Sequence, residues 1–438
     1  MKVEVEIVSK EILKPFSPTP QHLRSYQLSF LDQISPTVYN PCVMFYNPEK
    51  DTDFNVFEIS NKLKKSMSHV LTLFYPLAGR LKENTAFIDC NDEGIPYSEA
   101  RVNCQLSHFL KNPILPKELN KFIPFESDDM SDLVVGVQLN IFECGAIAIG
   151  SCISHKIADG LSSFMFLKSW AAIARGDHMQ ARPQFEAAKL FPPRNISGFS
   201  PRVGITNKNS IISKRFVFSA SAIEALRQKY AVDNKGSSRV EALSAFIWNR
   251  LGAATQLESK TADNDNQRLH TMVHAVNLRT RIEPPLSEHS FGNLFRIVMI
   301  VPSIDGSHSE EKRGIVQQMR EHISRIDDKY VKKLQEGTEH LDFIRKRAKE
   351  FSTRETSTFL SFSSWCKFPL YESDFGWGKP VWVGLPPLTF KNLVVLMDTR
   401  SGNGIEVYIN LDENDMAKLE TDDEFLAFES STEFEFGG

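Results

Sequence analysis

His155 ends a run of small and apolar residues in the stretch AIGSCISHKIADG at 148–160. It is the only one of the eleven histidines that is followed by an aspartate at the fourth position. An imidazole titrates near neutral pH, so it can take a proton from an alcohol or an amine and later return it. The carboxyl end of a buried strand holds such a residue rigidly beside the crevice in which α/β sheets place their sites. His155 is therefore a candidate general base.

Asp159 follows within reach of the ring, through a tight turn or a first helical turn. One interpretation is that its carboxylate orients the imidazole, as in a catalytic triad. The other is that it pairs with an arginine and holds the fold. A lone histidine at a strand end is more often a core residue than a catalyst, so this motif alone leaves both roles open.

No protein nucleophile accompanies this base. The sequence contains no GxSxG serine motif, no reactive-looking cysteine beside a second histidine and no glycine-rich phosphate loop. A base without a nucleophile indicates direct attack of one bound substrate on another. The sequence therefore favours group transfer from an activated donor to an acceptor.

A second unusual stretch is YESDFGWGKPVWV at 371–383. The chain has only five tryptophans, and glycines on both sides of Trp377 suit a tight loop with the indole wedged against a neighbouring element. By this argument residues 374–378 form a structural turn and not a catalytic one.

Several elements must position these residues. Apolar spacing predicts an opening strand, a helix over 56–74 and another helix that begins at Asp159–Gly160. Two strand pairs are predicted as well. One lies within 81–102, around a turn that carries asparagine and glycine, and the other joins 132–142 to 146–154 around the turn ECG.

Strands and helices alternate in both halves of the chain, which predicts an α/β fold of two similar-sized domains, each a mixed sheet with helices. The stretch 179–212 is proline-bearing and aperiodic, so it is the expected crossover linker between an N-terminal domain at 1–178 and a C-terminal domain at 213–438. The net charge of −4, with basic and acidic residues interspersed, argues against a nucleic-acid-binding surface.

Six cysteines without a CxxC pair, and no Cys/His cluster with zinc-like spacing, indicate reduced thiols and no metal site. No apolar run reaches the roughly 18 residues that a membrane span needs, and the start has no signal or transit character. We expect a cytoplasmic protein, most simply a monomer, with no permanently bound cofactor, no membrane contact and no obligate protein partner.

Taken together, SHKIADG at 154–160 and DFGWGKP at 374–380 resemble the plant acyl-CoA-dependent acyltransferases of the BAHD family. Further blocks similar to the family, in the family's order, are SPTP near the start, YPLAGRL at 75–81, IDCNDEGIPYSEARV at 88–102, AVNLRTR at 275–281, FGN at 291–293 and GIEVYI at 404–409. The likeness spans the whole chain and is greatest to the branch of vinorine-synthase-like alkaloid acetyltransferases and alcohol acyltransferases. It implies a fold like that of chloramphenicol acetyltransferase, with a channel between the two domains.

The resemblance also implies a role for each motif residue. His155 matches the general base, which deprotonates an acceptor hydroxyl so that it attacks the thioester of acyl-CoA. Asp159, beside Gly160, matches an aspartate that turns away from the site and pairs with an arginine, here Arg279. The family's loop lies away from the reacting atoms and supports the fold and coenzyme A binding; here it comprises Asp374, Phe375, Gly376, Trp377 and Gly378.

Weaker matches give further candidates. Ser363 and Trp365, in FSSWC, are expected near the substrate carbonyl as an oxyanion donor and a pocket wall, with a surface serine and a core tryptophan as the alternative. Tyr39, in SPTVY, is expected along the acceptor channel. Where the family's helix approaches the phosphates of coenzyme A, the matching residues are Ser238, Arg239 and Ser244.

One departure narrows the expected function. The anthocyanin-acylating branch of the family carries a Tyr-Phe-Gly-Asn-Cys string, whereas this chain has SFGNLF at 290–295, which argues against a flavonoid-glycoside acyltransferase. The expected reaction is transfer of an acetyl group from acetyl-CoA to a hydroxyl of a terpenoid, an alkaloid or an aliphatic alcohol. The alternatives are N-acylation of an amine and a catalytically silent binding protein of the same fold.

Overall fold

The computed structural model describes residues 2–47, 55–82, 86–111, 114–129, 131–177, 182–196, 211–232, 236–259, 269–301, 308–336 and 358–430. The strands are β1 (Val5–Leu13), β2 (Ser25–Gln27), β3 (Tyr39–Tyr46), β4 (Arg80–Leu81), β5 (Phe87–Asp89), β6 (Ile95–Val102), β7 (Val135–Phe142), β8 (Ile147–Ser154), β9 (Ile212–Phe218), β10 (Leu269–Asn277), β11 (Phe295–Ile300), β12 (Thr358–Ser364), β13 (Trp382–Gly384), β14 (Leu393–Asp398) and β15 (Ile405–Leu411). The α-helices are α1 (Phe30–Ile34), α2 (Val56–Leu73), α3 (Leu106–Lys111), α4 (Gly160–Ala174), α5 (Ala187–Leu190), α6 (Ala220–Lys229), α7 (Arg239–Ser259), α8 (His308–Ser324), α9 (Asp328–Glu336), α11 (Glu413–Glu420) and α12 (Asp423–Phe428). Short 3-10 helices are η1 (Gln21–Leu23), η2 (Tyr75–Ala78) and η3 (Pro116–Phe122).

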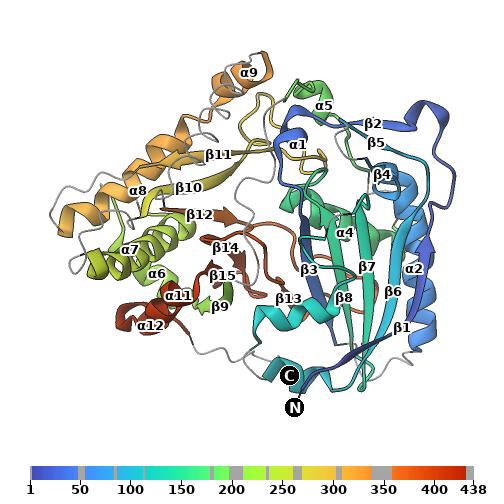
Figure 1. Cartoon of the computed structure of the whole chain (residues 1–438), viewed down its shortest axis with the longest axis horizontal. Coiled ribbons are helices and arrows are strands. Elements are labelled where there is room, and N and C mark those ends of the chain that lie inside the picture. The colour runs from blue at the N-terminus through green and yellow to red at the C-terminus, as the bar shows by residue number, and fades with distance from the viewer. Residues whose placement is uncertain are drawn as a thin grey trace.

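The first sheet has six strands in the order β1-β6-β7-β8-β3-β13, and helices α2 and α4 lie beside it (Figure 1). Its strands β7 and β8 form the predicted antiparallel hairpin, with Gly145 of the ECG turn at φ +80. Every residue of β8 is buried, because α2 and α4 pack on one face of the sheet and α3 and η3 pack on the other. This strand is therefore a rigid support for the residues that follow it.

The second sheet also has six strands, in the order β11-β10-β12-β14-β15-β9. Its outer face packs against α6, α7, α8 and α11 in one core (Figure 1). Its inner face contributes Val395 and Tyr408 to the core of the first sheet. The predicted α/β class, with two sheets each flanked by helices, is confirmed.

The expected hairpin within 81–102 is wrong. Strand β5 pairs with β2 and β4 in a small third sheet, whereas β6 pairs with β1 and β7 in the first sheet. The turn between them is tied to the N-terminal segment: Asp92 accepts hydrogen bonds from the backbone N–H and hydroxyl of Thr19, at 2.9 and 2.6 Å. The turn residues alone predict that β5 and β6 pair with each other. The hydrogen bonds to Thr19 instead hold the turn against a distant segment, and the two strands belong to different sheets.

The two halves of the chain interlock at β13, which pairs antiparallel with β3 of the first sheet although it comes from the second half. The predicted boundaries at 178 and 213 stay a prediction, and residues 178–181 and 197–210 lie outside the described part of the chain. Among the described helices, none is both long and apolar enough to cross a membrane.

Candidate active site

His155 stands directly after β8, in the turn that leads to α4. Its backbone N–H donates to the carbonyl of Val38 at 2.8 Å, which ties the turn to the segment that enters β3. The imidazole is half-buried and lies 5.7 Å, between ring centroids, from Phe295 at the start of β11. His155 therefore lies between the first sheet and Phe295, the first residue of strand β11 in the second sheet.

Asn293 fixes the tautomer of this imidazole. Its amide nitrogen Nδ2 donates to the His155 carbonyl at 2.8 Å and to Asp32 Oδ1 at 2.9 Å. Both partners are acceptors, so the amide oxygen Oδ1 must be the atom that lies 2.9 Å from His155 Nδ1. An oxygen accepts, so Nδ1 carries the proton and the Nε2 lone pair is left basic. Among the described residues, none hydrogen-bonds to this Nε2.

The surroundings keep the ring neutral. Burial lowers the pKa of His155 below its usual 6.5, although Asp159 and Asn293 oppose that shift, and the ammonium of Lys156 adds to it. A neutral imidazole with a free Nε2 is the form that a general base needs. Within the described residues, no group of three His, Cys, Asp or Glu side chains is placed to hold a metal ion.

Asp159 does not orient the imidazole. Its carboxylate pairs with Arg279, with Oδ2 2.8 Å from Nη1 and Oδ1 3.2 Å from Nη2. The same carboxylate caps α4 by accepting from Ser162 N–H at 2.8 Å, and it accepts from Leu294 N–H at 3.0 Å. Burial alone would raise the pKa of Asp159, but the ion pair and these hydrogen bonds bring it below its usual value of 3.8. The carboxylate is a permanently charged anchor between α4 and the loop after β10.

Gly160 allows the second half of the chain to approach this anchor. A Cβ at this position would lie 3.0 Å from the indole nitrogen of Trp365, which follows β12 and also packs edge-on against Phe164 of α4. Phe368 would lie 3.3 Å from the same Cβ, so both rings would have to shift by a few tenths of an ångström to admit a side chain at 160. Trp365 thus lies against the turn that carries the histidine motif.

We expect Gly160→Ala to lower the free energy of unfolding by about 1–3 kcal/mol, as overpacking typically does. Because the clash is with the indole, the loss is expected to shrink when alanine is introduced into a Trp365→Phe background. Chemical denaturation of the four proteins of this cycle measures the coupling, and strictly additive effects would contradict the assigned contact.

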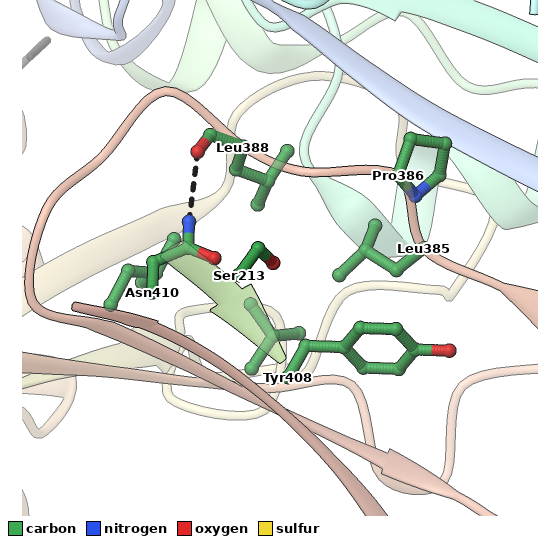
Figure 2. A pocket seen from close by; sticks show the side chains of 8 residues that line it. Ser213, Leu385, Pro386, Leu388, Tyr408 and Asn410 are labelled. Atoms are coloured by element: carbon green, nitrogen blue, oxygen red, sulfur yellow. Dashed lines mark hydrogen bonds between the residues drawn. The ribbon is translucent and has the colours of Figure 1, made fainter. Parts of the chain in front are cut away.

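Ser363 lies on the inner face of the second sheet. It is in register with Val395 of β14, which is in register with Tyr408 of β15, so these three side chains share one face. A small recess opens on that face (Figure 2), and its lining consists of Ser213, Leu385, Pro386, Leu388, Leu393, Val395, Tyr408 and Asn410. Although about 180 Å³ lies between its lining atoms and the adjoining solvent, the recess has no room for even a water-sized molecule, whereas typical ligand pockets measure roughly 300–1,000 Å³. The recess is therefore a gap in the packing and not a substrate pocket.

Comparison with known proteins identifies the family. The profile of the Transferase family matches residues 3–426. Stemmadenine O-acetyltransferase from Catharanthus roseus is 39% identical, covering 96% of this chain and 97% of its own length. Limonoid 21-O-acetyltransferase from Melia azedarach is 37% identical, covering 98% and 99%. The chain belongs to the BAHD acyltransferase family.

The three-dimensional fold also supports membership of the BAHD family. The crystal structure of vinorine synthase superposes with a TM-score of 0.85, at 34% identity, over 98% of this chain and 100% of that chain. Vinorine synthase from Rauvolfia serpentina is 35% identical in sequence, over 96% of this chain. The family expected from the two motifs is therefore confirmed.

The DFGWG loop of this BAHD protein is a packed turn. Asp374 Oδ1 accepts from the N–H groups of Gly376 and Gly378, at 2.7 and 3.0 Å, and both glycines have φ near +100. Phe375 is fully buried against Trp170 of α4, with ring centroids 4.8 Å apart. Trp377 packs against Phe375 and lies under the ammonium of Lys62, 5.5 Å from the ring centroid. The loop joins α2, α4 and the second half of the chain, as expected of a structural turn.

Several predicted site residues have other surroundings. Tyr39 is 3% exposed, packs against Phe125 and donates from its hydroxyl to the Leu133 carbonyl at 2.7 Å, so it is a core residue and not a channel wall. Ser244 is fully buried, and its hydroxyl has no hydrogen-bond partner among the described residues. A position inside the core leaves it no access to coenzyme A.

The start of α7 uses its polar residues for local structure. Ser238 caps the helix in a reciprocal box with Glu241, with bonds of 2.8 and 3.2 Å. Arg239 pairs with Asp398 at 2.8 Å and donates to the Gly402 carbonyl at 2.8 Å. These partners occupy both side chains, so the predicted coenzyme A contacts of Ser238 and Arg239 have no support in this arrangement.

Sequence reasoning missed Asn293, Asp32 and Lys156 as neighbours of the BAHD histidine. Asn293 ends the FGN block, and Asp32 is the fourth residue of the capping sequence Ser29–Asp32. Those local signals were visible, but neither indicates contact with residue 155. Only the fold brings the three segments together.

Proposed function

We propose that this chain is an acyl-CoA-dependent O-acyltransferase that moves an acetyl group from acetyl-CoA to a hydroxyl of an alkaloid, a terpenoid or an aliphatic alcohol. The observation that carries the proposal is the half-buried, neutral His155 whose Nε2 is unprotonated and unpartnered within the described residues. The relatives support O-acetylation as the reaction, since those named above are O-acetyltransferases of stemmadenine and of a limonoid. An acyl-CoA co-substrate is the donor that the family uses.

The reaction follows from the state of the imidazole. Nε2 takes the proton of the acceptor hydroxyl as the hydroxyl oxygen attacks the thioester carbonyl, which forms a C–O bond and a tetrahedral oxyanion. Collapse of this intermediate breaks the C–S bond and expels the coenzyme A thiolate, which receives the proton from the imidazolium. The products are an ester, free coenzyme A and the neutral base with which the cycle began.

The oxyanion needs donors of its own, and Ser363 and Trp365 remain the proposed candidates. Ser363 supports this role because its hydroxyl has no partner among the described residues and lies on the inner face of the second sheet. Trp365 supports it because its indole nitrogen approaches the histidine turn at Gly160. Loss of one oxyanion donor typically lowers kcat by about 100- to 1,000-fold.

The pH dependence of kcat/KM follows from the lowered pKa of His155. A base works when unprotonated, so activity is present above its pKa and falls as the pH drops through it. Because burial lowers the pKa of His155 below 6.5, we expect the acid limb of kcat/KM for ester formation to have its midpoint below pH 6.5. An acid limb centred above pH 6.5 would contradict the assignment of His155 as a neutral base.

The proposal is tested by incubating the purified chain with acetyl-CoA and a panel of terpenoid, indole-alkaloid and simple alcohols, with matched amines beside them. Mass spectrometry of the products is expected to find acetate esters for one class of alcohol. Exclusive formation of amides would redefine the enzyme as an N-acyltransferase. Binding of acetyl-CoA without any product from this panel or from other acyl-CoA donors would favour a silent binding protein.

A further inference from the structure

Two buried carboxylates lie close to His155. Asp159 is held by Arg279. The other is Asp32 of α1, whose surface is fully buried. Its position near His155 is not explained by the role of Asp159 or by the proposed reaction.

Each oxygen of Asp32 accepts two hydrogen bonds. Oδ2 accepts from the backbone N–H and the hydroxyl of Ser29, at 2.9 and 2.6 Å, and this pair caps α1. Oδ1 accepts from the backbone N–H and the side-chain Nδ2 of Asn293, both at 2.9 Å. One half of the carboxylate thus holds the helix, and the other half holds Asn293 by both of its nitrogens.

Those two bonds decide which way the amide of Asn293 points. If the amide were flipped, its oxygen would lie against the carboxylate of Asp32 and the carbonyl of His155, which are both acceptors. With Nδ2 fixed there, Oδ1 lies 2.9 Å from His155 Nδ1. We propose that Asp32, and not Asp159, is the carboxylate that orients His155, and that it acts as a positioning residue through the amide of Asn293.

Lys156 holds the same helix from the other side. Its Nζ donates to the carbonyl of Gln33, in α1, at 2.7 Å and to that of Ser35, the C-cap of α1, at 3.1 Å. A cation at a helix C-terminus is favourable, and a charge this close also balances the buried carboxylate. Helix α1 is therefore held by hydrogen bonds from Lys156, which follows His155, and from the amide of Asn293.

This inference rests on the proposed function of His155, and its tests separate the two. In Asp32→Ala, the backbone N–H of Asn293 loses its acceptor and Nδ2 keeps only the carbonyl of His155, so the amide of Asn293 loses its fixed orientation. We expect kcat to fall by about 10- to 100-fold, as is typical when a group that orients a functional histidine is removed, with KM for both substrates little changed. Asn293→Ala removes the same link and is expected to cause a similar loss.

A double-mutant cycle distinguishes positioning from a general loss of stability. Because Asp32 acts only through Asn293, the double variant is expected to lose no more activity than either single variant. The matched control is Asp412→Ala, which removes the carboxylate that caps α11 by accepting from Asp415 N–H at 2.9 Å. This control is expected to lower stability and leave kcat unchanged. Additive losses in the cycle, or an equal fall of kcat in the control, would overturn the proposal.

Nitrogen NMR of histidine in the wild-type protein gives a readout that needs no turnover. The His155 signals, assigned by their loss in His155→Ala, are expected to show a neutral ring protonated at Nδ1. Protonation at Nε2 instead would refute the link from Asp32 through Asn293 to His155. If the tautomer is as expected but His155→Ala keeps full activity, the proposed function fails while the positioning of the ring stands.

Discussion

His155→Ala is expected to lower turnover of acetyl-CoA and alcohol by about 10²–10⁴-fold, because general-base catalysis typically contributes that much. The fold should survive the change. The ring is half-buried and makes one side-chain hydrogen bond, to Asn293 at 2.9 Å, while the backbone bond to Val38 is retained. Binding of acetyl-CoA, measured by calorimetry, is expected to remain close to that of the wild type.

The matched control is His108→Ala, which removes an exposed imidazole from α3 and should leave turnover unchanged. Circular dichroism and thermal unfolding of both variants verify the fold. Near-normal turnover in a folded His155→Ala would falsify the base assignment. A weak dependence on His155 with a steep alkaline rise in rate would instead indicate an amine acceptor, which needs less help from a base.

Arg279→Ala is expected to have the largest effect on stability, lowering the free energy of unfolding by about 3–5 kcal/mol. The side chains of Arg279 and Asp159 are 2% and 9% exposed, so removing the guanidinium leaves a carboxylate buried without its counter-charge. That loss is a large part of the roughly 5–15 kcal/mol by which typical domains are stable. Urea denaturation measures it.

The same pair predicts the sign of a pH effect. The pKa of Asp159 is lowered in the folded chain, so its contribution to stability is present above the unfolded pKa, near 3.8, and is lost as the pH falls through the folded value. Without the guanidinium, burial raises the pKa of this carboxyl, so the stability deficit of Arg279→Ala relative to the wild type should shrink as the pH falls through the acid range. As a control, Lys379→Ala breaks the exposed pair with Glu372 and should cost about 0–1 kcal/mol. Equal stability losses in the two variants would contradict the anchoring role of Arg279.

The local elements around the site could be predicted from the sequence because their signals are local. The turn ECG joins two apolar alternating runs, and the structure has the hairpin of β7 and β8 there. Asp159–Gly160 precedes an apolar run of helical spacing, and Asp159 is the N-cap of α4. His155 could be singled out for the same reason, since its strand, its turn and its helix are contiguous in the chain.

What could not be predicted depends on contacts between distant segments. Asn293 bonds to residues 138 and 261 positions away, and no periodicity or spacing encodes such a meeting. The pairing of β13 with β3 and the separation of β5 from β6 have the same cause. Tyr39 was predicted to line the channel because SPTVY resembles a family stretch, but every residue of β3 is buried and this ring packs in the core beside Phe125.

We propose that acetyl passes directly from acetyl-CoA to an alcohol without an acetylated protein intermediate. The measurement that tests it most directly is thiol release from acetyl-CoA with and without the alcohol that forms an ester, combined with intact mass spectrometry of the chain. We expect thiol release only when the alcohol is present, and a protein mass that stays unchanged throughout. A burst of thiol in the absence of alcohol, with one acetyl group added to the protein, would contradict it.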